Sequence, residues 1–205
     1  MNKIVAVSVV VVIAVVLAIA AVAVMNNGGD KDVPSNDVTV SPGKVAVVCF
    51  SETGNTERIA KEIAEITGGD FVKIIPDVPY TDADRNYNDS SSRARLEQND
   101  PAARPAIANG IDLSAYSTVF LGYPIWFGDS PKIMWTFVET HGLEGKTVVP
   151  FCTSGSSGVG SSDDHLEEHS DGGTWLDGNR FSSSASASEI RGWISGLGIG
   201  LGATA

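Results

Sequence analysis

A short turn near the start of the folded region is unusually rich in hydrogen-bond donors. It reads Ser-Glu-Thr-Gly-Asn-Thr, residues 51–56, and lies between an apolar run and an amphipathic segment. The hydroxyls of Ser51, Thr53 and Thr56 can each donate a hydrogen bond, and Gly54 lets a ligand approach the backbone closely. A helix that begins here would add free N–H groups and the positive end of its dipole. The turn is therefore predicted to bind phosphate.

The turn contains neither lysine nor arginine. A Walker loop uses G-x-x-x-x-G-K-[ST] to bind a triphosphate with magnesium, and a dinucleotide fold uses G-x-G-x-x-G. Neither pattern is present, so a single phosphate monoester held by neutral donors fits better than a long phosphate chain. A plain helix cap formed by Ser51 or Thr53 is the alternative, and it would explain one hydroxyl but not three.

Two further loops suggest what carries the phosphate. Residues 123–131 read Tyr-Pro-Ile-Trp-Phe-Gly-Asp-Ser-Pro, and we expect Trp126 and Phe127 to be partly exposed. Exposed tryptophan is costly unless something flat stacks on it. Residues 153–160 are small, so their backbone can approach a ligand edge. The three loops together predict a site for a planar heterocycle that carries one phosphate.

The pattern of elements predicts how these loops are brought together. Strands are expected at residues 44–50, 71–75, 118–124 and 147–153, with a weaker one near Trp175, and helices at residues 56–66, 93–99, 131–140, 163–168 and 188–197. Apolar, β-branched runs that alternate with helices predict a doubly wound α/β domain, with about five parallel strands and helices on both faces. Ligands of such folds bind beyond the carboxyl ends of the strands, where all three loops lie.

The N-terminal region has a different character. Residues 4–25 are apolar apart from Ser8, which is long enough to cross a bilayer core of about 30 Å. A signal peptide has a shorter apolar region of about 7–15 residues, so the length favours an uncleaved anchor over cleavage near residues 21–23. Lys3 before the run predicts a cytoplasmic N-terminus and an external domain. We expect an anchor at residues 1–25, a flexible tether at 26–43, the folded domain at 44–197 and a disordered tail at 198–205.

Charge and reactive side chains exclude several classes of function. A net charge of −11 argues against nucleic-acid binding, which requires clustered lysine and arginine. Cys49 and Cys152 lie in apolar runs and are expected to be small buried side chains rather than disulfide or metal ligands. His165 and His169 have a spacing that permits a surface metal site, but a solvated acidic helix is the favoured interpretation. No catalytic residue and no metal ligand is assigned.

Three segments in this order resemble a flavodoxin-like protein. They are S-E-T-G-N-T, G-Y-P-I-W-F-G and C-T-S-G-S-S-G, and the resemblance covers roughly residues 44–197. It implies a flavodoxin-like fold that binds flavin mononucleotide (FMN), with Trp126 as the stacking partner of the isoalloxazine ring. The phosphate would be held by Ser51, Thr53, Gly54, Asn55 and Thr56. The ring would be flanked by Pro124, Ile125, Trp126, Phe127, Gly128, Thr153, Ser154, Gly155 and Gly158.

The segment between the second and third strands departs from short flavodoxins. Residues 76–110 form a long insertion, in which Tyr80 and the Arg104-Pro105 pair resemble features of long-insertion variants. Phe127 stands where related sequences often carry a second tryptophan. Asp129 beside the site is expected to lower the reduction potential of a bound flavin, because its negative charge disfavours further negative charge nearby.

Three functions remain open at this point. The first is an FMN-dependent electron carrier tethered to the membrane, with its redox protein or quinone partner unidentified. The second is an FMN-dependent reductase of the NAD(P)H:quinone type, for which the insertion would supply the substrate-facing wall. The third is a binding module that keeps the fold without turnover.

Overall fold

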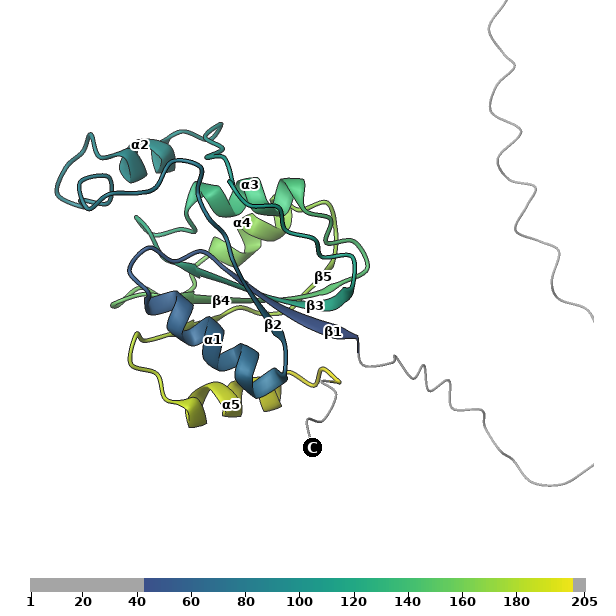
Figure 1. Ribbon diagram of the computed structural model, residues 1–205. Coiled ribbons are helices and arrows are strands. Elements are labelled where there is room, and N and C mark those ends of the chain that lie inside the picture. The colour runs from purple at the N-terminus through teal and green to yellow at the C-terminus, as the bar shows by residue number, and fades with distance from the viewer. Residues whose placement is uncertain (1–42, 201–205) are drawn as a thin grey trace, which may run out of the picture. The chain divides into compact units, whose positions relative to one another are not determined.

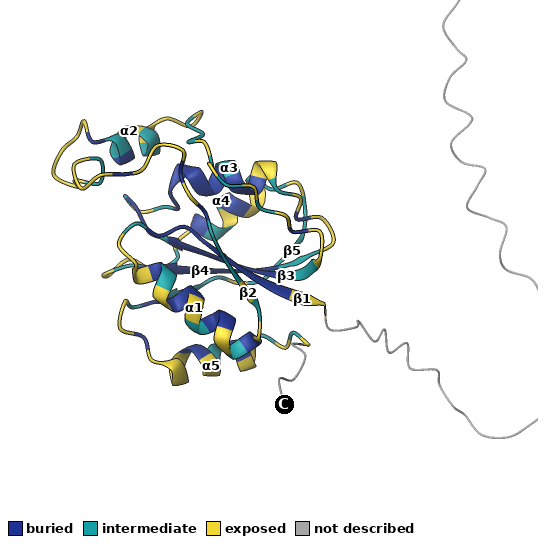
Figure 2. Ribbon diagram, viewed as in Figure 1, coloured by how far each residue is buried: buried dark blue, intermediate teal, exposed yellow. Residues whose placement is uncertain are grey.

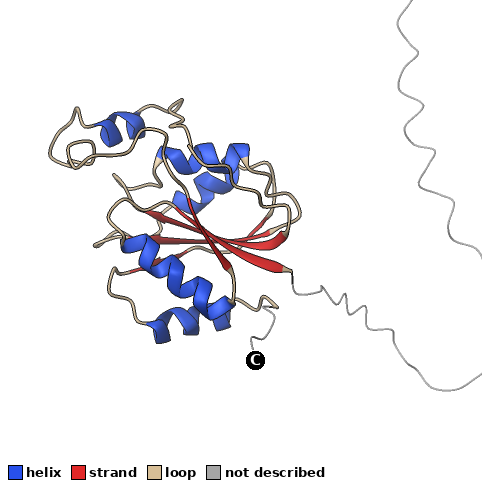
Figure 3. Cartoon of the chain, in the orientation of Figure 1, coloured by secondary structure: helices blue, strands red, loops and turns tan. Residues whose placement is uncertain are grey.

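The computed structural model describes residues 43–200. Its strands are β1 (Lys44–Cys49), β2 (Asp70–Lys73), β3 (Tyr116–Pro124), β4 (Thr147–Thr153), β5 (Thr174–Trp175) and β6 (Asn179–Phe181). Its helices are α1 (Asn55–Thr67), α2 (Arg93–Asn99), α3 (Lys132–Thr140), α4 (Ser162–His169) and α5 (Ala187–Gly196). The sheet runs β2-β1-β3-β4-β5, with β6 also paired to β4, and every strand pair is parallel. Figure 3 shows the strands as a central layer between helices. The predicted doubly wound α/β fold is confirmed.

The predicted membrane anchor and all of the tether except residue 43 lie outside the described residues, as do residues 201–205 of the predicted tail. Within residues 43–200, no helix combines the length and the apolar character needed to span a membrane.

The fifth strand position is filled by two short strands. β5 pairs with the start of β4, at Thr147 and Val148, and β6 pairs with its end. Between them, Asp177 and Gly178 are poor strand formers, and the N–H of Gly178 donates to Asp163 Oδ2 at 2.9 Å. The strand expected near Trp175 is therefore interrupted, and its second half, β6, was not foreseen.

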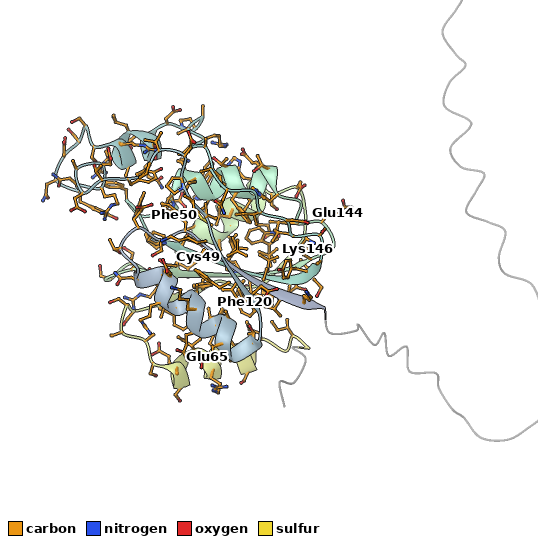
Figure 4. All side chains as sticks on the ribbon, viewed as in Figure 1. Cys49, Phe50, Glu65, Phe120, Glu144 and Lys146 are labelled. Atoms are coloured by element: carbon orange, nitrogen blue, oxygen red, sulfur yellow. The ribbon has the colours of Figure 1, made fainter. Side chains whose placement is uncertain are left out.

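The apolar runs of the sequence arise because the sheet is covered on both faces. Along β1, Ala46 and Val48 belong to the core under α3 and α4, whereas Val47 and Cys49 belong to the core under α1 and α5. Figure 1 shows these two helical layers, and Figure 2 shows the buried strands between them. In Figure 4, Phe120 lies between the sheet and α1, in the second of these cores.

Both cysteines are small buried side chains, as predicted. Cys49 and Cys152 have no solvent-exposed surface, and neither is in a disulfide. Burial raises the pKa of each thiol to about 12, so both stay protonated at neutral pH. They contribute packing rather than reactive chemistry.

Helix boundaries follow local signals that the sequence contains. Gly54 and Gly68 flank α1 with φ values of 84° and 65°, a left-handed conformation that glycine adopts without steric cost. Pro131 precedes α3 as its cap residue rather than forming part of the first turn, a shift of one residue from expectation.

The insertion, residues 76–110, leaves the sheet and returns close to the point where it left. Pro76 and Ile107 form an antiparallel bridge, so its two ends lie side by side. Arg104 donates two hydrogen bonds to Glu139 of α3, at 2.6 and 2.7 Å. Tyr80 packs edge-on against Trp126, with ring centroids 5.1 Å apart. Figure 1 shows α2 on the same side of the sheet as α3 and α4. Through Tyr80, the insertion contacts the loop at the carboxyl end of β3.

Candidate functional site

A pocket of about 260 Å³ lies where the loops after β1, β3 and β4 meet. These are the three loops that the sequence singled out, and two further segments join them: the insertion and the segment before α5. The pocket is lined by Thr53, Asn55, Arg85, Tyr87, Pro124, Ile125, Trp126, Thr153, Ser154, Gly155 and Ser183.

The loop after β1 places polar groups at the N-terminus of α1. Thr53 and Asn55 line the pocket, and a side chain added at Gly54 would meet nothing within 4 Å, so its backbone faces open space. Ser51 and Thr56 are almost fully buried, at 2% and 1% exposure. Of the three predicted hydroxyls, only that of Thr53 belongs to a pocket-lining residue.

The buried hydroxyl of Thr56 connects two loops. Thr56 Oγ1 lies 2.8 Å from Thr153 Oγ1, in a buried hydrogen bond between residues 97 positions apart. Thr153 in turn lines the pocket. The bond therefore holds the first and third loops close together.

The loop after β3 forms one wall. Pro124, Ile125 and Trp126 line the pocket, whereas Phe127 and Gly128 form a tight two-residue turn with φ values of 51° and 91°. The turn is closed by hydrogen bonds of 2.8 and 3.1 Å between the backbones of residues 126 and 129.

Trp126 is more buried than the sequence suggested. Only 8% of its surface is exposed, because it packs edge-on against Phe50 at 5.3 Å and Tyr80 at 5.1 Å. The expectation of partial exposure is wrong for Trp126 and holds for Phe127, which is half-buried. The covering ring, Tyr80, comes from the insertion, which sequence reasoning did not place against this loop.

Tyr87 of the insertion supplies an exposed flat ring at the pocket, a role that sequence reasoning missed. It is 51% exposed, stacks on Phe127 with centroids 4.2 Å apart, and donates from its hydroxyl to the carbonyl of Ile125 at 3.1 Å. Its only signal in the sequence was an aromatic residue within a polar segment.

The loop after β4 is held by hydrogen bonds from neighbouring elements. Arg180 of β6 donates to the carbonyl of Ser154 at 2.7 Å and to its hydroxyl at 3.2 Å, and the Ser154 hydroxyl donates to the carbonyl of Ser157. Thr153, Ser154 and Gly155 line the pocket, whereas Gly158 does not.

Two arginines contribute to the pocket, one directly and one by holding a segment that lines it. Arg58 of α1 donates to the carbonyls of Ser183 and Ala185 at 3.0 and 2.9 Å, which fixes the segment before α5. Arg85 of the insertion lines the pocket directly, and sequence reasoning missed it as well. Burial raises the pKa of Glu52 in the first loop, and the positive charge of Arg85 opposes that rise, so Arg85 acts electrostatically on this loop.

The two histidines of α4 contact different carboxylates. His165 Nδ1 lies 2.8 Å from Asp129 Oδ2, and His169 Nδ1 lies 3.1 Å from Glu139 Oε1 while its ring lies 4.0 Å from that of Trp135. The helix therefore packs on α3 and on the loop after β3, rather than being solvated throughout. Within residues 43–200, no cluster of three His, Cys, Asp or Glu side chains is arranged to hold a metal ion.

Comparison with known proteins agrees with this geometry. The model of the flavodoxin family matches residues 44–197, which include every loop of the pocket. The chain belongs to the flavodoxin family. This membership confirms the resemblance of the three loop segments. None of the curated proteins matches the chain.

Two solved structures from Bacteroides are similar to this flavodoxin-family chain. A proposed flavoprotein of Bacteroides eggerthii is 40% identical with a TM-score of 0.72, covering 77% of this chain and 99% of its own. A second, of Bacteroides uniformis, is 39% identical with a TM-score of 0.72, covering 75% and 98%. A flavoprotein of Lactobacillus acidophilus in complex with FMN is 18% identical, covers 74% and 99%, and has a TM-score of 0.52, a similarity of fold alone.

Proposed function

We propose that this chain is an FMN-binding electron-transfer protein held at a membrane by its N-terminal segment. The observation that carries the FMN assignment is the convergence of three loops on one pocket. That pocket combines the N-terminus of α1, with Thr53 and Asn55, and the aromatic rings of Trp126 and Tyr87. FMN has one phosphate and one planar ring system, which match these two halves.

The residues divide between the two parts of the ligand. Backbone N–H groups at the start of α1, with Thr53 and Asn55, would bind the phosphate. Residues 124–126, Tyr87 and residues 153–155 would border the ring and shield it from water. Bound FMN supplies the one- and two-electron redox chemistry, and the protein supplies position and electrostatics.

Asp129 does not line the pocket, but it follows the wall formed by residues 124–126 and would influence the reduction potential of a bound flavin from there. It lies three residues beyond Trp126, and its carboxylate pairs with His165 at 2.8 Å. A carboxylate near the ring would disfavour added negative charge and so lower the potential.

A reductase is the second candidate, favoured by one observation. The insertion contributes Arg85 and Tyr87 to the pocket wall, and these residues can contact a substrate as well as a cofactor. A redox titration of the FMN-loaded chain that resolves two one-electron steps supports the carrier. Rapid oxidation of NAD(P)H with a quinone acceptor supports the reductase instead. A chain that binds FMN and shows neither behaviour would be a binding module.

Membrane tethering rests on residues 4–25, which are apolar apart from Ser8. We expect the full-length chain to stay with membranes through alkaline carbonate extraction, and a chain without residues 1–25 to be released. A fusion at Ala205 that is cut by external protease in intact cells would support an external domain. Release of the full-length chain by carbonate would contradict the anchor, and protection of the fusion would contradict the external placement.

A further inference from the structure

The phosphate-binding turn has no cation of its own, yet its pocket has one. Residues 51–56 contain neither lysine nor arginine, whereas Arg85 of the insertion lines the same pocket as Thr53 and Asn55. The two segments lie about 30 residues apart in sequence and are separated by α1 and β2.

Arg85 has an unused hydrogen-bond donor. Its side chain is 19% exposed, and its Nε is buried without a hydrogen-bond partner among the described residues. Its guanidinium pairs with Asp82 through Nη2 alone, and the Asp82 side chain is fully exposed. A buried N–H without an acceptor is unfavourable, so the exposed Asp82 satisfies this guanidinium only in part.

The other cations near the turn are already engaged. Glu52 is attracted by Arg85, Lys73 and Arg93. Lys73 Nζ binds Glu57 at 2.8 Å, and Arg93 Nε binds Glu97 at 2.6 Å while its Nη1 donates to the carbonyl of Val78 at 2.8 Å. Arg58 of α1 is engaged as well, because it donates to the carbonyls of Ser183 and Ala185. Arg85 is the one cation of these four that lines the pocket, so it is best placed to bind a new anion.

We propose that Arg85 binds the phosphate of the flavin mononucleotide, and so replaces the basic residue that the turn itself lacks. This inference rests on the proposed function. A guanidinium presents several N–H groups in a plane and matches phosphate oxygens with two parallel hydrogen bonds. Binding would place a positive charge against the phosphate, in a chain whose net charge is −11.

A contact between Arg85 and the phosphate would favour FMN over riboflavin. Riboflavin has the same ring as FMN and no phosphate. If Arg85 acts on the phosphate, its removal weakens FMN binding and leaves riboflavin binding largely unchanged. If Arg85 acts on the ring or on the fold, its removal weakens the binding of both ligands alike.

The experiment measures the dissociation constants of FMN and riboflavin by flavin fluorescence quenching, for the purified full-length chain and two variants. Arg85→Gln removes the proposed contact. Arg191→Gln removes the same charge from an exposed position on α5 that does not line the pocket. We expect Arg85→Gln to raise the dissociation constant of FMN by about tenfold to a hundredfold, as for a lost hydrogen bond to a charged group. The dissociation constant of riboflavin should rise by less than about threefold. Arg191→Gln should match the unaltered chain.

The other outcomes separate the two hypotheses. An unchanged FMN affinity in Arg85→Gln, or an equal loss for both flavins, would overturn the role of Arg85 and leave the proposed function intact. Failure of the unaltered chain to bind either flavin would overturn both. If Arg85→Gln does not fold, Arg85→Lys serves as the test variant, because lysine keeps the positive charge and lacks the paired N–H donors of the guanidinium. A lower ratio of FMN to riboflavin affinity than in the unaltered chain supports the proposal, and an unchanged ratio refutes it.

Discussion

Phe127 is the only non-glycine residue within 43–200 that has a positive φ, at 51°. A left-handed conformation costs an L-residue roughly 1–2 kcal/mol. The aromatic ring compensates, because it stacks on Tyr87 at 4.2 Å and lies 4.0 Å from the guanidinium carbon of Arg95. The strained turn beside the pocket is therefore held by contacts from the insertion.

Two substitutions at Phe127 separate backbone strain from ring packing. Phe127→Ala and Phe127→Gly both lose the stacking on Tyr87, but only glycine adopts the positive φ freely. We expect the glycine variant to be more stable than the alanine variant by about 1 kcal/mol, after its greater unfolded-state entropy is included. Urea unfolding of both variants measures this difference. Equal stabilities would show that the left-handed conformation is not a source of strain.

At the scale of residues, the sequence predicted the polar turn because its donors are contiguous. Thr53, Asn55 and Gly155 could be recognised from local composition alone. Arg85 and Tyr87 could not, because they lie in a polar segment without periodicity and reach the pocket only through the packing of the insertion. The burial of Trp126 was misjudged for the same reason.

Among the strands, β3 and β4 pack closely where a glycine faces an aromatic ring. Gly122 of β3 lies opposite Phe151 of β4, and a Cβ added at Gly122 would come within 2.2 Å of the Phe151 ring. The absence of a side chain at Gly122 therefore makes room for an aromatic ring in the core beneath the pocket.

A matched pair of Gly→Ala substitutions tests this close packing. Gly122→Ala should destabilise the fold by about 1–3 kcal/mol, because the ring of Phe151 must move. Gly192→Ala on α5 meets nothing within 4 Å and should stabilise the helix by about 0.5–1 kcal/mol. The free energies of unfolding in urea give both values. A neutral Gly122→Ala variant would contradict the packing described for β3 and β4.

At the scale of elements, strong periodicity made prediction reliable. The apolar positions of α1 and the β-branched runs of β1, β3 and β4 identified these elements to within one or two residues. The division of the fifth strand was missed because it depends on a contact with Asp163, a residue of helix α4. Such contacts leave no local pattern.

In the whole molecule, the parallel sheet brings together chemistry that is dispersed along the chain. The Thr56–Thr153 hydrogen bond joins loops 97 residues apart, and the insertion adds a wall from a third region. The strand order β2-β1-β3-β4 places the loops after β1, β3 and β4 at one edge, which explains why the general position of the site could be predicted from the sequence. The contribution of the insertion required the folded structure.

The ligand proposed for this pocket is a flat ring that carries one phosphate. The most direct test titrates FMN with the purified full-length chain, freed of any bound flavin, and follows flavin fluorescence. We predict saturable quenching by one flavin per chain, and no displacement by ATP, whose triphosphate the turn lacks the lysine to bind. Unquenched FMN fluorescence at every protein concentration, in a chain shown to be folded, would contradict the account.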